Sequence, residues 1–216
     1  MIFDLDGTLL NTIADLGNST NHALATLGYP THQLGEYNMM VGNGIDVLFE
    51  RALPEGEKSV ENIAKMRKAF IEYYKKNLTA KTEIYPGVEE LVHEINKRGI
   101  ALAVASNKYQ DGTATLVKHF FPTIPFVATL GQRQGIPTKP DPQIISDILT
   151  IHPVTCDEVL YVGDSGVDMQ TAANANLIAC GVSWGIRPVE ELKAFNPHYI
   201  VDNANEILAI IDKHNN

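Results

Sequence analysis

The sequence is poor in cysteine and tryptophan, and basic residues are fewer than acidic ones. Two cysteines among 216 residues are too few for a disulfide framework or a zinc site. Seventeen Lys and Arg against 26 Asp and Glu give a net charge of −9. This charge argues against a nucleic-acid-binding surface and against binding to an anionic membrane. We therefore expect no nucleic-acid partner, no membrane partner and a reducing, cytoplasmic environment.

Long apolar runs are also missing. The most apolar stretch, residues 100–105, has the length of a strand and falls far short of the ~20 residues of a membrane span. The first residues show no basic segment followed by an apolar one, so we expect no signal peptide. A length of 216 residues fits one domain that carries a smaller inserted domain.

Residues 12–83 show a helical pattern that no strand pattern interrupts. Residues at helical spacing, nearly all of them apolar, form two stripes. The first is made of Ile13, Leu16, Thr20, Ala23, Leu24 and Leu27, and the second of Val60, Ile63, Ala64, Phe70, Ile71 and Tyr74. Gly28 and Pro30 end the first stripe. We predict a helical cap domain at residues 12–83, inserted into a core domain of residues 1–11 and 84–216.

Apolar strands alternate with amphipathic helices after residue 83. Strands are predicted at 101–105, 126–130, 159–162, 177–182 and 199–201, with amphipathic helices between them and after the last. This alternation is typical of a parallel sheet that is covered on both faces. The predicted fold class is α/β, with a Rossmann-like three-layer core, a parallel sheet and an inserted α-helical cap.

Polar residues follow the ends of several predicted strands, namely Asp4 and Asp6, Ser106 and Asn107, and Asp164. The carboxyl ends of parallel strands face one crevice in an open α/β sheet, so these side chains are expected to converge. Asp4 and Asp6 are two residues apart and leave the same side of an extended chain. Such a pair suits one carboxylate as nucleophile and the other as proton donor and acceptor.

Each of these groups also has an ordinary structural interpretation. Asp6-Gly7 is compatible with a solvated turn, and Lys139 with a solvated loop lysine. Ser106-Asn107, taken alone, favours a helix N-cap, which is compatible with an anion site. Residues 163–168 form either a turn into a helix or a loop that faces a metal, and residues 42–44 either a plain turn or a functional loop.

The repulsion between clustered carboxylates helps to decide between the structural and the functional interpretations. Two bare carboxylates about 4 Å apart repel by about 4 kcal/mol at an effective dielectric constant near 20. Gathering Asp4, Asp6, Asp164 and Asp168 around one crevice therefore requires compensation. Mg²⁺ is the natural candidate because it binds few protein oxygens and prefers phosphate oxygens, and Lys139 offsets further charge. The pattern predicts a phosphate site in which Asp4 attacks in line.

Four segments occur in the order of the motifs of the haloacid dehalogenase-like superfamily of phosphohydrolases, which the chain resembles over nearly its full length. They are Asp4-Leu5-Asp6-Gly7-Thr8, Ser106-Asn107, Lys139-Pro140, and Gly163-Asp164 with Asp168. The helical insertion resembles the α-helical cap of the phosphoglycolate phosphatase-like subgroup, many members of which carry a glycine-bearing loop like residues 42–44.

The resemblance implies a role for each matched residue. Asp4 is implied as the nucleophile that forms an aspartyl-phosphate, Asp6 as the general acid and base, and Lys139 as the group that neutralises charge. The implied phosphate- and substrate-binding residues are Thr8, Ser106, Asn107, Lys139, Gly42, Asn43 and Gly44. The implied Mg²⁺ ligands are Asp4, the Asp6 carbonyl and Asp164, with Asp168 orienting either Lys139 or the metal shell. Asp6 favours phosphoryl over carbon–halogen chemistry, because the dehalogenase branch lacks this second acid.

The leading hypothesis is a Mg²⁺-dependent phosphatase for a small phosphorylated metabolite, with phosphoglycolate as the first candidate by analogy. Two alternatives stay open: a β-phosphoglucomutase-like phosphosugar mutase, and a catalytically idle regulatory protein on the same fold. Arg51 is a candidate for reading a substrate carboxylate, although a surface helix residue is its ordinary interpretation. We expect a monomer or a homodimer.

Overall fold

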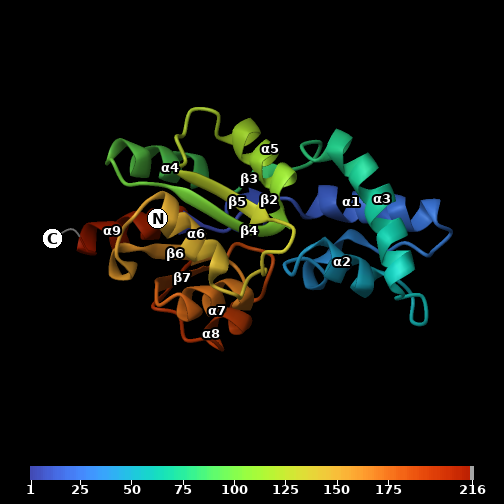
Figure 1. Cartoon of the computed structure of the whole chain (residues 1–216). Helices are drawn as coiled ribbons and strands as arrows, with labels where there is room; N and C mark the ends of the chain where they lie inside the picture. Colours follow the sequence, from blue (N-terminus) through green and yellow to red (C-terminus); the bar gives the residue numbers. More distant parts are fainter. Residues whose placement is uncertain (215–216) are drawn as a thin grey trace.

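A six-stranded parallel sheet forms the centre of the computed structural model, which describes residues 1–214 (Figure 1). Its strand order is β5-β4-β1-β6-β7-β8. The strands are β1 (Ile2–Phe3), β4 (Ala103–Tyr109), β5 (Ala128–Gln132), β6 (Leu160–Gly163), β7 (Ile178–Val182) and β8 (Tyr199–Val201). The first strand thus lies in the middle of the sheet, between β4 and β6. The residues that follow β1 therefore lie at the centre of the carboxyl edge.

Helices cover both faces of this sheet. The buried residues of α4 (Val88–Lys97), α5 (Gln110–Phe120) and α9 (Ala204–His214) belong to one apolar cluster. Those of α6 (Gln143–Ile151), α7 (Gly166–Asn174) and α8 (Val189–Lys193) belong to a second cluster. Successive strand residues divide between the two, with Phe3 in the first and Ile2 in the second, because strand side chains alternate between faces. The predicted three-layer α/β core is confirmed.

A group of helices lies beside the sheet (Figure 1) and comprises α1 (Ile13–Thr26), the short 3₁₀ helix η1 (Leu34–Met39), α2 (Ile45–Ala52) and α3 (Val60–Asn77). Two short antiparallel strands, β2 (Leu10–Asn11) and β3 (Glu83–Ile84), flank the group where the chain enters and leaves it. The apolar faces of α1 and α3 pack together, and their buried residues continue into the first core cluster. The exact boundaries of the predicted cap domain stay a prediction.

Two local predictions differ from the structure. Ser106 and Asn107 lie within β4 rather than after it, and α5 begins at Gln110 with Tyr109 in the N-cap position. The N-cap interpretation of Ser106-Asn107 is therefore wrong. Pairing of β4 with β5 is interrupted after Ala105 and resumes at Tyr109, which carries the strand past the end of its apolar run.

Another 3₁₀ helix, η2 (Cys156–Glu158), leads into β6. Among residues 1–214, no helix combines the length and the apolar character that crossing a bilayer requires.

Candidate active site

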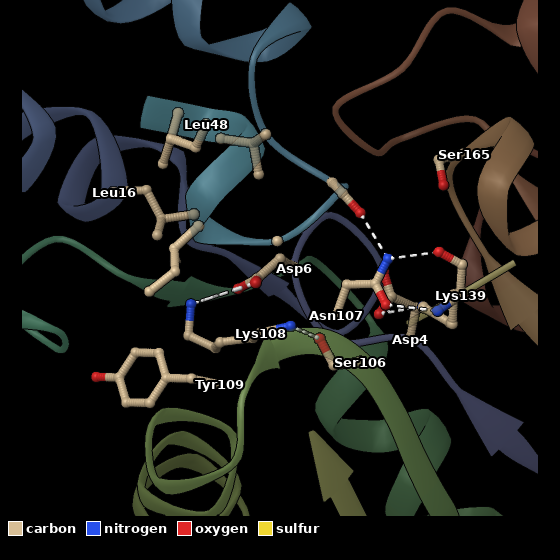
Figure 2. Close-up of a pocket in the computed structure, with 14 residues that line it drawn as sticks. Asp4, Asp6, Leu16, Leu48, Ser106, Asn107, Lys108, Tyr109, Lys139 and Ser165 are labelled. Carbon is tan, nitrogen blue, oxygen red and sulfur yellow. Dashed lines mark hydrogen bonds and ion pairs between the residues drawn. The ribbon is translucent and has the colours of Figure 1, made fainter. Parts of the chain in front are cut away.

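A pocket lies between the carboxyl edge of the sheet and the helical group (Figure 2). The polar residues that line it include Asp4, Asp6, Ser106, Asn107, Lys108, Lys139 and Ser165. These residues come from the ends of β1, β4 and β6 and from the loop before α6. The strand ends thus bring together side chains that are far apart in the sequence, as the topology of a parallel sheet requires.

Asp4 is held in the wall of this pocket. Its backbone N–H donates to the carbonyl of Val162 at 2.9 Å, and its Oδ1 lies 2.9 Å from Lys139 Nζ. Burial and the charge of Asp168 raise the pKa of Asp4 to about 7, against the opposing effect of Lys139. The ionised form of Asp4 is therefore less favourable here than in water, even beside the Lys139 ammonium.

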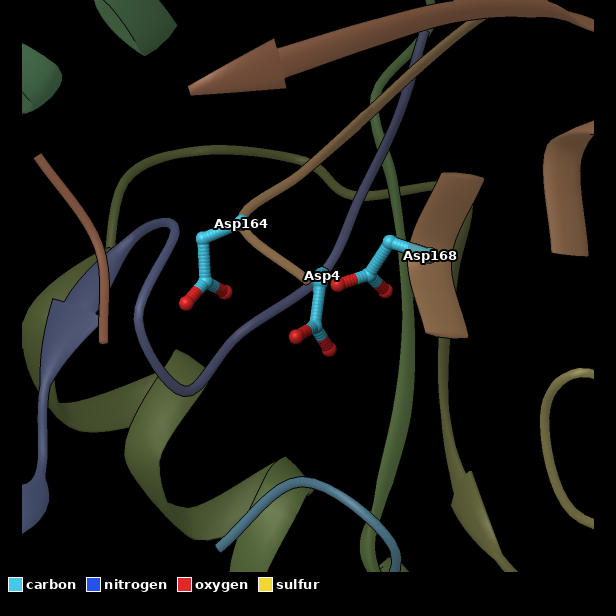
Figure 3. Close-up of side chains that lie close together, drawn as sticks. All are labelled: Asp4, Asp164 and Asp168. Carbon is cyan, nitrogen blue, oxygen red and sulfur yellow. The ribbon is translucent and has the colours of Figure 1, made fainter. Parts of the chain in front are cut away.

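Three buried acids, Asp4, Asp164 and Asp168, converge at this point (Figure 3). Each offers a carboxylate oxygen, and these oxygens all lie within 4.8 Å of one another. Burial, together with the charges of Asp168 and Asp4, raises the pKa of Asp164 well above its usual range. The arrangement matches the predicted cluster in three of its four members.

Asp164 occupies a space that two glycines leave open. A Cβ at Gly7, where φ is +97°, would lie 2.3 Å from Asp164 Oδ2, and one at Gly185 would lie 2.2 Å from Asp164 Cβ. Its Oδ1 accepts from the Thr8 hydroxyl at 3.1 Å, and its Oδ2 from the Ile186 N–H at 2.8 Å. Thr8, a predicted phosphate ligand, is thus buried against Asp164, and its hydroxyl serves that carboxylate.

Lys139 is fixed by four oxygen atoms. Besides Asp4, its ammonium lies 2.7 Å from Asp168 Oδ1, 3.0 Å from the Ala105 carbonyl and 3.1 Å from the Tyr161 hydroxyl. Burial alone lowers the pKa of a lysine, but the charges of Asp168 and Asp4 outweigh it and hold the pKa of Lys139 well above its usual value. The lysine therefore stays charged beside the Asp4 carboxylate.

Asp168 serves both Lys139 and the start of α7. Its Oδ2 accepts from Ser165 Oγ at 2.6 Å and from the Ser165 N–H at 3.1 Å, which completes a capping box. The helix-entry interpretation of residues 163–168 is thus confirmed, and the metal-facing role of this loop stays a prediction. Because both oxygens already accept hydrogen bonds, the carboxylate is better suited to orienting Lys139 than to binding a metal.

Asn107 joins three separate segments. Its Oδ1 accepts from the Lys139 N–H at 2.8 Å, and its Nδ2 donates to the carbonyls of Lys139 and Gly42, both at 3.1 Å (Figure 2). The neighbouring Ser106 accepts from the Lys108 N–H at 3.2 Å and lines the pocket. These contacts place the loop at residues 42–44 directly over the carboxyl end of β4.

Within that loop, Gly42 and Gly44 line the pocket, and Gly44 precedes α2 with a positive φ of 86°. The side chain of Asn43 instead accepts from Arg51 at 2.9 Å. Arg51 also donates to the carbonyls of Met39 and Met40. Its guanidinium is used to hold the loop, which argues against the hypothesis that Arg51 reads a substrate carboxylate.

Lys108 was not identified from the sequence. Its ammonium lies 3.1 Å and 3.2 Å from the two carboxylate oxygens of Asp6, and its side chain is only 2% exposed. The charged residue directly after Ser106-Asn107 was the available signal, but a lysine at the end of a strand is usually solvated. Asp6 is consequently paired with a different lysine from Asp4, although both acids line one pocket.

A parallel sheet with acids after its central strand and a helical insertion beside its carboxyl edge is the arrangement that the resemblance of the four motifs predicts. The family model described as haloacid dehalogenase-like hydrolase matches residues 1–182, and the chain belongs to this family. The resemblance seen in the four motifs is confirmed.

Curated relatives and solved structures are similar to this protein over almost the whole chain. Phosphoglycolate phosphatases from Vibrio parahaemolyticus and Mesorhizobium japonicum are 32% and 31% identical, over 97% and 94% of this chain and 94% and 90% of theirs. A solved structure of a predicted phosphoglycolate phosphatase from Haemophilus somnus has a TM-score of 0.89 at 29% identity, over 97% of this chain and 96% of that one. The chain is therefore an enzyme of the haloacid dehalogenase-like phosphatases, as the sequence predicts.

Proposed function

We propose that this enzyme is a Mg²⁺-dependent phosphatase that hydrolyses a small phosphorylated metabolite through an aspartyl-phosphate at Asp4. The observation that carries the proposal is the pairing of two acids with two lysines in one pocket. Asp4 lies 2.9 Å from Lys139, and Asp6 lies 3.1 Å from Lys108. One carboxylate is thus available to attack phosphorus while the other handles protons.

The chemistry takes two steps. In the first, a carboxylate oxygen of Asp4 bonds to phosphorus, the bond from phosphorus to the leaving oxygen breaks, and Asp6 gives that oxygen its proton. In the second, Asp6 takes a proton from water, the water oxygen bonds to phosphorus, and the bond from phosphorus to Asp4 breaks. Lys139 offsets the charge of the phosphoryl oxygens in both steps, and Ser106 and the Asn107 backbone bind them.

The residues present fit a hard divalent cation. Asp4 and Asp164 offer buried carboxylate oxygens in a cluster whose negative charge exceeds the adjacent positive charge, and oxygen is the donor that Mg²⁺ prefers. The Asp6 side chain is turned to Lys108, so its main-chain carbonyl is the atom we assign to the metal. A bound Mg²⁺ supplies positive charge for the phosphoryl oxygens.

Phosphoglycolate is the first candidate substrate because the relatives over nearly the full chain carry that name. The enzyme acts in this proposal on a small molecule enclosed between the sheet edge and the helical group. A cytoplasmic location and a monomeric or homodimeric state stay predictions from the sequence.

The test is release of inorganic phosphate from a panel of phosphorylated metabolites, with and without Mg²⁺. We expect turnover of phosphoglycolate in Mg²⁺, loss of turnover in a chelator, and loss in Asp4→Asn. Turnover that survives in Asp4→Asn would remove the nucleophile assignment. Formation of an isomer instead of free phosphate would identify the enzyme as a mutase.

A further inference from the structure

Lys108 is the residue of the pocket whose role the proposed chemistry leaves open. Its side chain begins at the end of β4 and lies almost wholly buried, with 2% of it exposed. Burying an ammonium is unfavourable unless it is paired and hydrogen-bonded. The buried position of Lys108 therefore needs an explanation in terms of what the ammonium contacts.

The ammonium has two partners on opposite parts of the molecule. On the core side it lies 3.1 Å and 3.2 Å from the two oxygens of Asp6, so it spans the carboxylate rather than one atom of it (Figure 2). On the side of the helical group it lies 4.9 Å from the centre of the Tyr74 ring, a distance that allows a cation–π contact.

Tyr74 belongs to α3 and is fully buried. Its ring stacks on Phe70 at 4.9 Å and meets the Tyr109 ring edge-on at 6.3 Å. Within residues 1–214 its hydroxyl has no hydrogen-bond partner, so the ring rather than the hydroxyl makes its contacts. The helical group thus covers Lys108 with an aromatic face and leaves the Lys108 side chain almost without solvent contact.

We propose that Lys108 is a positioning residue, which holds the Asp6 carboxylate in the orientation that proton transfer requires and does so when Tyr74 of α3 covers it. The inference rests on the proposed function of Asp6 as the general acid and base. The Asp6 side chain is only 13% exposed and has no second charged partner within ion-pair distance among the described residues, so the ammonium sets which way its carboxylate turns. A displaced catalytic group can lose about 10²-fold in rate.

A different role for Lys108 would be to bind the carboxylate of phosphoglycolate directly. The contacts disfavour this role, because the ammonium already donates to both carboxylate oxygens of Asp6 and is covered by the Tyr74 ring. The apolar side chains that the helical group adds to the pocket, Leu16, Val41, Ile45 and Leu48, provide no replacement charge. The two roles give opposite kinetic results and are separated below.

The experiment compares Lys108→Met and Lys108→Arg with the exposed Lys118→Met as a matched control. The substrates are phosphoglycolate, 2-hydroxyethyl phosphate, which has no carboxylate, and p-nitrophenyl phosphate, whose leaving group needs no proton. We expect Lys108→Met to lower kcat by about 10- to 10²-fold on both alkyl phosphates at nearly unchanged KM. On p-nitrophenyl phosphate, the burst of nitrophenolate from Lys108→Met is expected to keep a near wild-type rate. We expect Lys108→Arg to recover part of kcat and Lys118→Met to match the wild type.

A double variant tests whether Lys108 acts through Asp6. If it does, Asp6→Asn with Lys108→Met is no slower on phosphoglycolate than Asp6→Asn alone, because the group that Lys108 positions is already gone. If the double variant instead shows the product of the two single-variant losses in kcat, the inference is overturned. So would a KM that rises for phosphoglycolate alone, which is the result expected of a carboxylate-binding lysine, or an unchanged kcat in Lys108→Met.

Folding is checked by circular dichroism and by the melting temperature. If Lys108→Met does not fold, Lys108→Gln takes its place with the same expectations, because it keeps a donor and removes the charge. Failure of the proposed function is a separate result: the wild type would then release no phosphate from any substrate in Mg²⁺, whereas failure of this inference leaves the wild type active.

Discussion

Asp168 shows how one side chain can serve both structure and activity. It caps α7 through Ser165 and places its other oxygen 2.7 Å from the Lys139 ammonium. We predict that Asp168→Asn lowers kcat by about 10- to 10²-fold, because a neutral amide holds the ammonium less firmly and a small displacement is costly in rate. Steady-state kinetics on phosphoglycolate, with the exposed Asp111→Asn as control, checks this. Equal kcat in the two variants would contradict the role assigned to Asp168.

The pKa of Asp4 makes the stability of the metal-free protein depend on pH. Burial raises this pKa to about 7, whereas an unfolded chain has an Asp pKa of about 3.9. Between these values the folded state binds more protons than the unfolded state, so its free energy of unfolding falls as pH rises from about 4 to about 7. Asp4→Asn lacks this titrating group. We therefore predict that, in chelator, the melting temperature of Asp4→Asn minus that of the wild type increases as pH rises from about 4 to about 7.

Added Mg²⁺ is expected to reverse the trend. Ionised carboxylates bind the cation and protonated ones do not, so the rise in wild-type melting temperature on adding Mg²⁺ is expected to be larger at pH 8 than at pH 5. Differential scanning fluorimetry at both pH values measures it. A Mg²⁺ effect that is equal at pH 5 and pH 8, or equal in wild type and Asp4→Asn, would argue against a metal site at Asp4.

At the scale of single residues, the sequence predicts which acids converge but not what each contacts. Asp4, Asp164 and Lys139 were found because they follow strands or lie between prolines in a recognisable order. The inward turn of Thr8 onto Asp164 and the pairing of Lys108 with Asp6 depend on side-chain directions. No periodicity or spacing encodes those directions.

The junction between the helical group and the sheet is closed by Asp15, in the first turn of α1. Its Oδ2 accepts from the N–H groups of Lys81 and Thr82, at 2.9 Å and 2.8 Å, and from the Thr82 hydroxyl at 2.9 Å. We predict that Asp15→Ala lowers the free energy of unfolding by about 2–3 kcal/mol, since it removes a buried acceptor and takes the partner from the two N–H groups.

Urea denaturation measures this loss, with Asp111→Ala as the control in the first turn of α5. Asp111 is exposed, and its removal is expected to change stability by less than ~1 kcal/mol. Equal losses in Asp15→Ala and Asp111→Ala would show that the Asp15 contacts do not stabilise the junction.

Elements with a long apolar pattern were predicted well, and short ones were not. The stripes of α1 and α3 and the strands of the sheet have enough residues to show a period. The strands β2 and β3 have two residues each, and η1 has six, so neither period is visible in them. β4 extends past Ser106 and Asn107 because its pairing with β5 resumes at Tyr109, which a local apolar run does not reveal.

At the scale of the whole molecule, polar contacts across the pocket join the sheet and the helical group, and two of them reach the loop backbone. Asn107 donates to the Gly42 carbonyl at 3.1 Å, and Arg187 donates to the Val41 carbonyl at 2.9 Å. We predict that Arg187→Ala raises KM by about 5- to 10-fold with little loss of kcat, because losing about 1 kcal/mol frees the loop over the pocket. Kinetics on phosphoglycolate checks it. A fall in kcat at constant KM would instead place Arg187 in the chemical step.

The overall arrangement was predictable because its rules are topological. Alternating strands and helices require a parallel sheet, and a parallel sheet gathers its strand ends at one edge. The seating of the helical group on that edge was not predictable. It depends on the packing of Tyr74 over Lys108 and on the Arg187 contact, both made by residues more than 30 positions apart.

The most direct test of a phosphatase that works through Asp4 is mass spectrometry of the enzyme quenched during turnover of phosphoglycolate in Mg²⁺. We predict a phosphoryl group on the peptide that contains Asp4, sensitive to hydroxylamine and absent from Asp4→Asn. A phosphoryl group on another residue, or an active enzyme that never carries one, would contradict the assignment of Asp4 as the nucleophile.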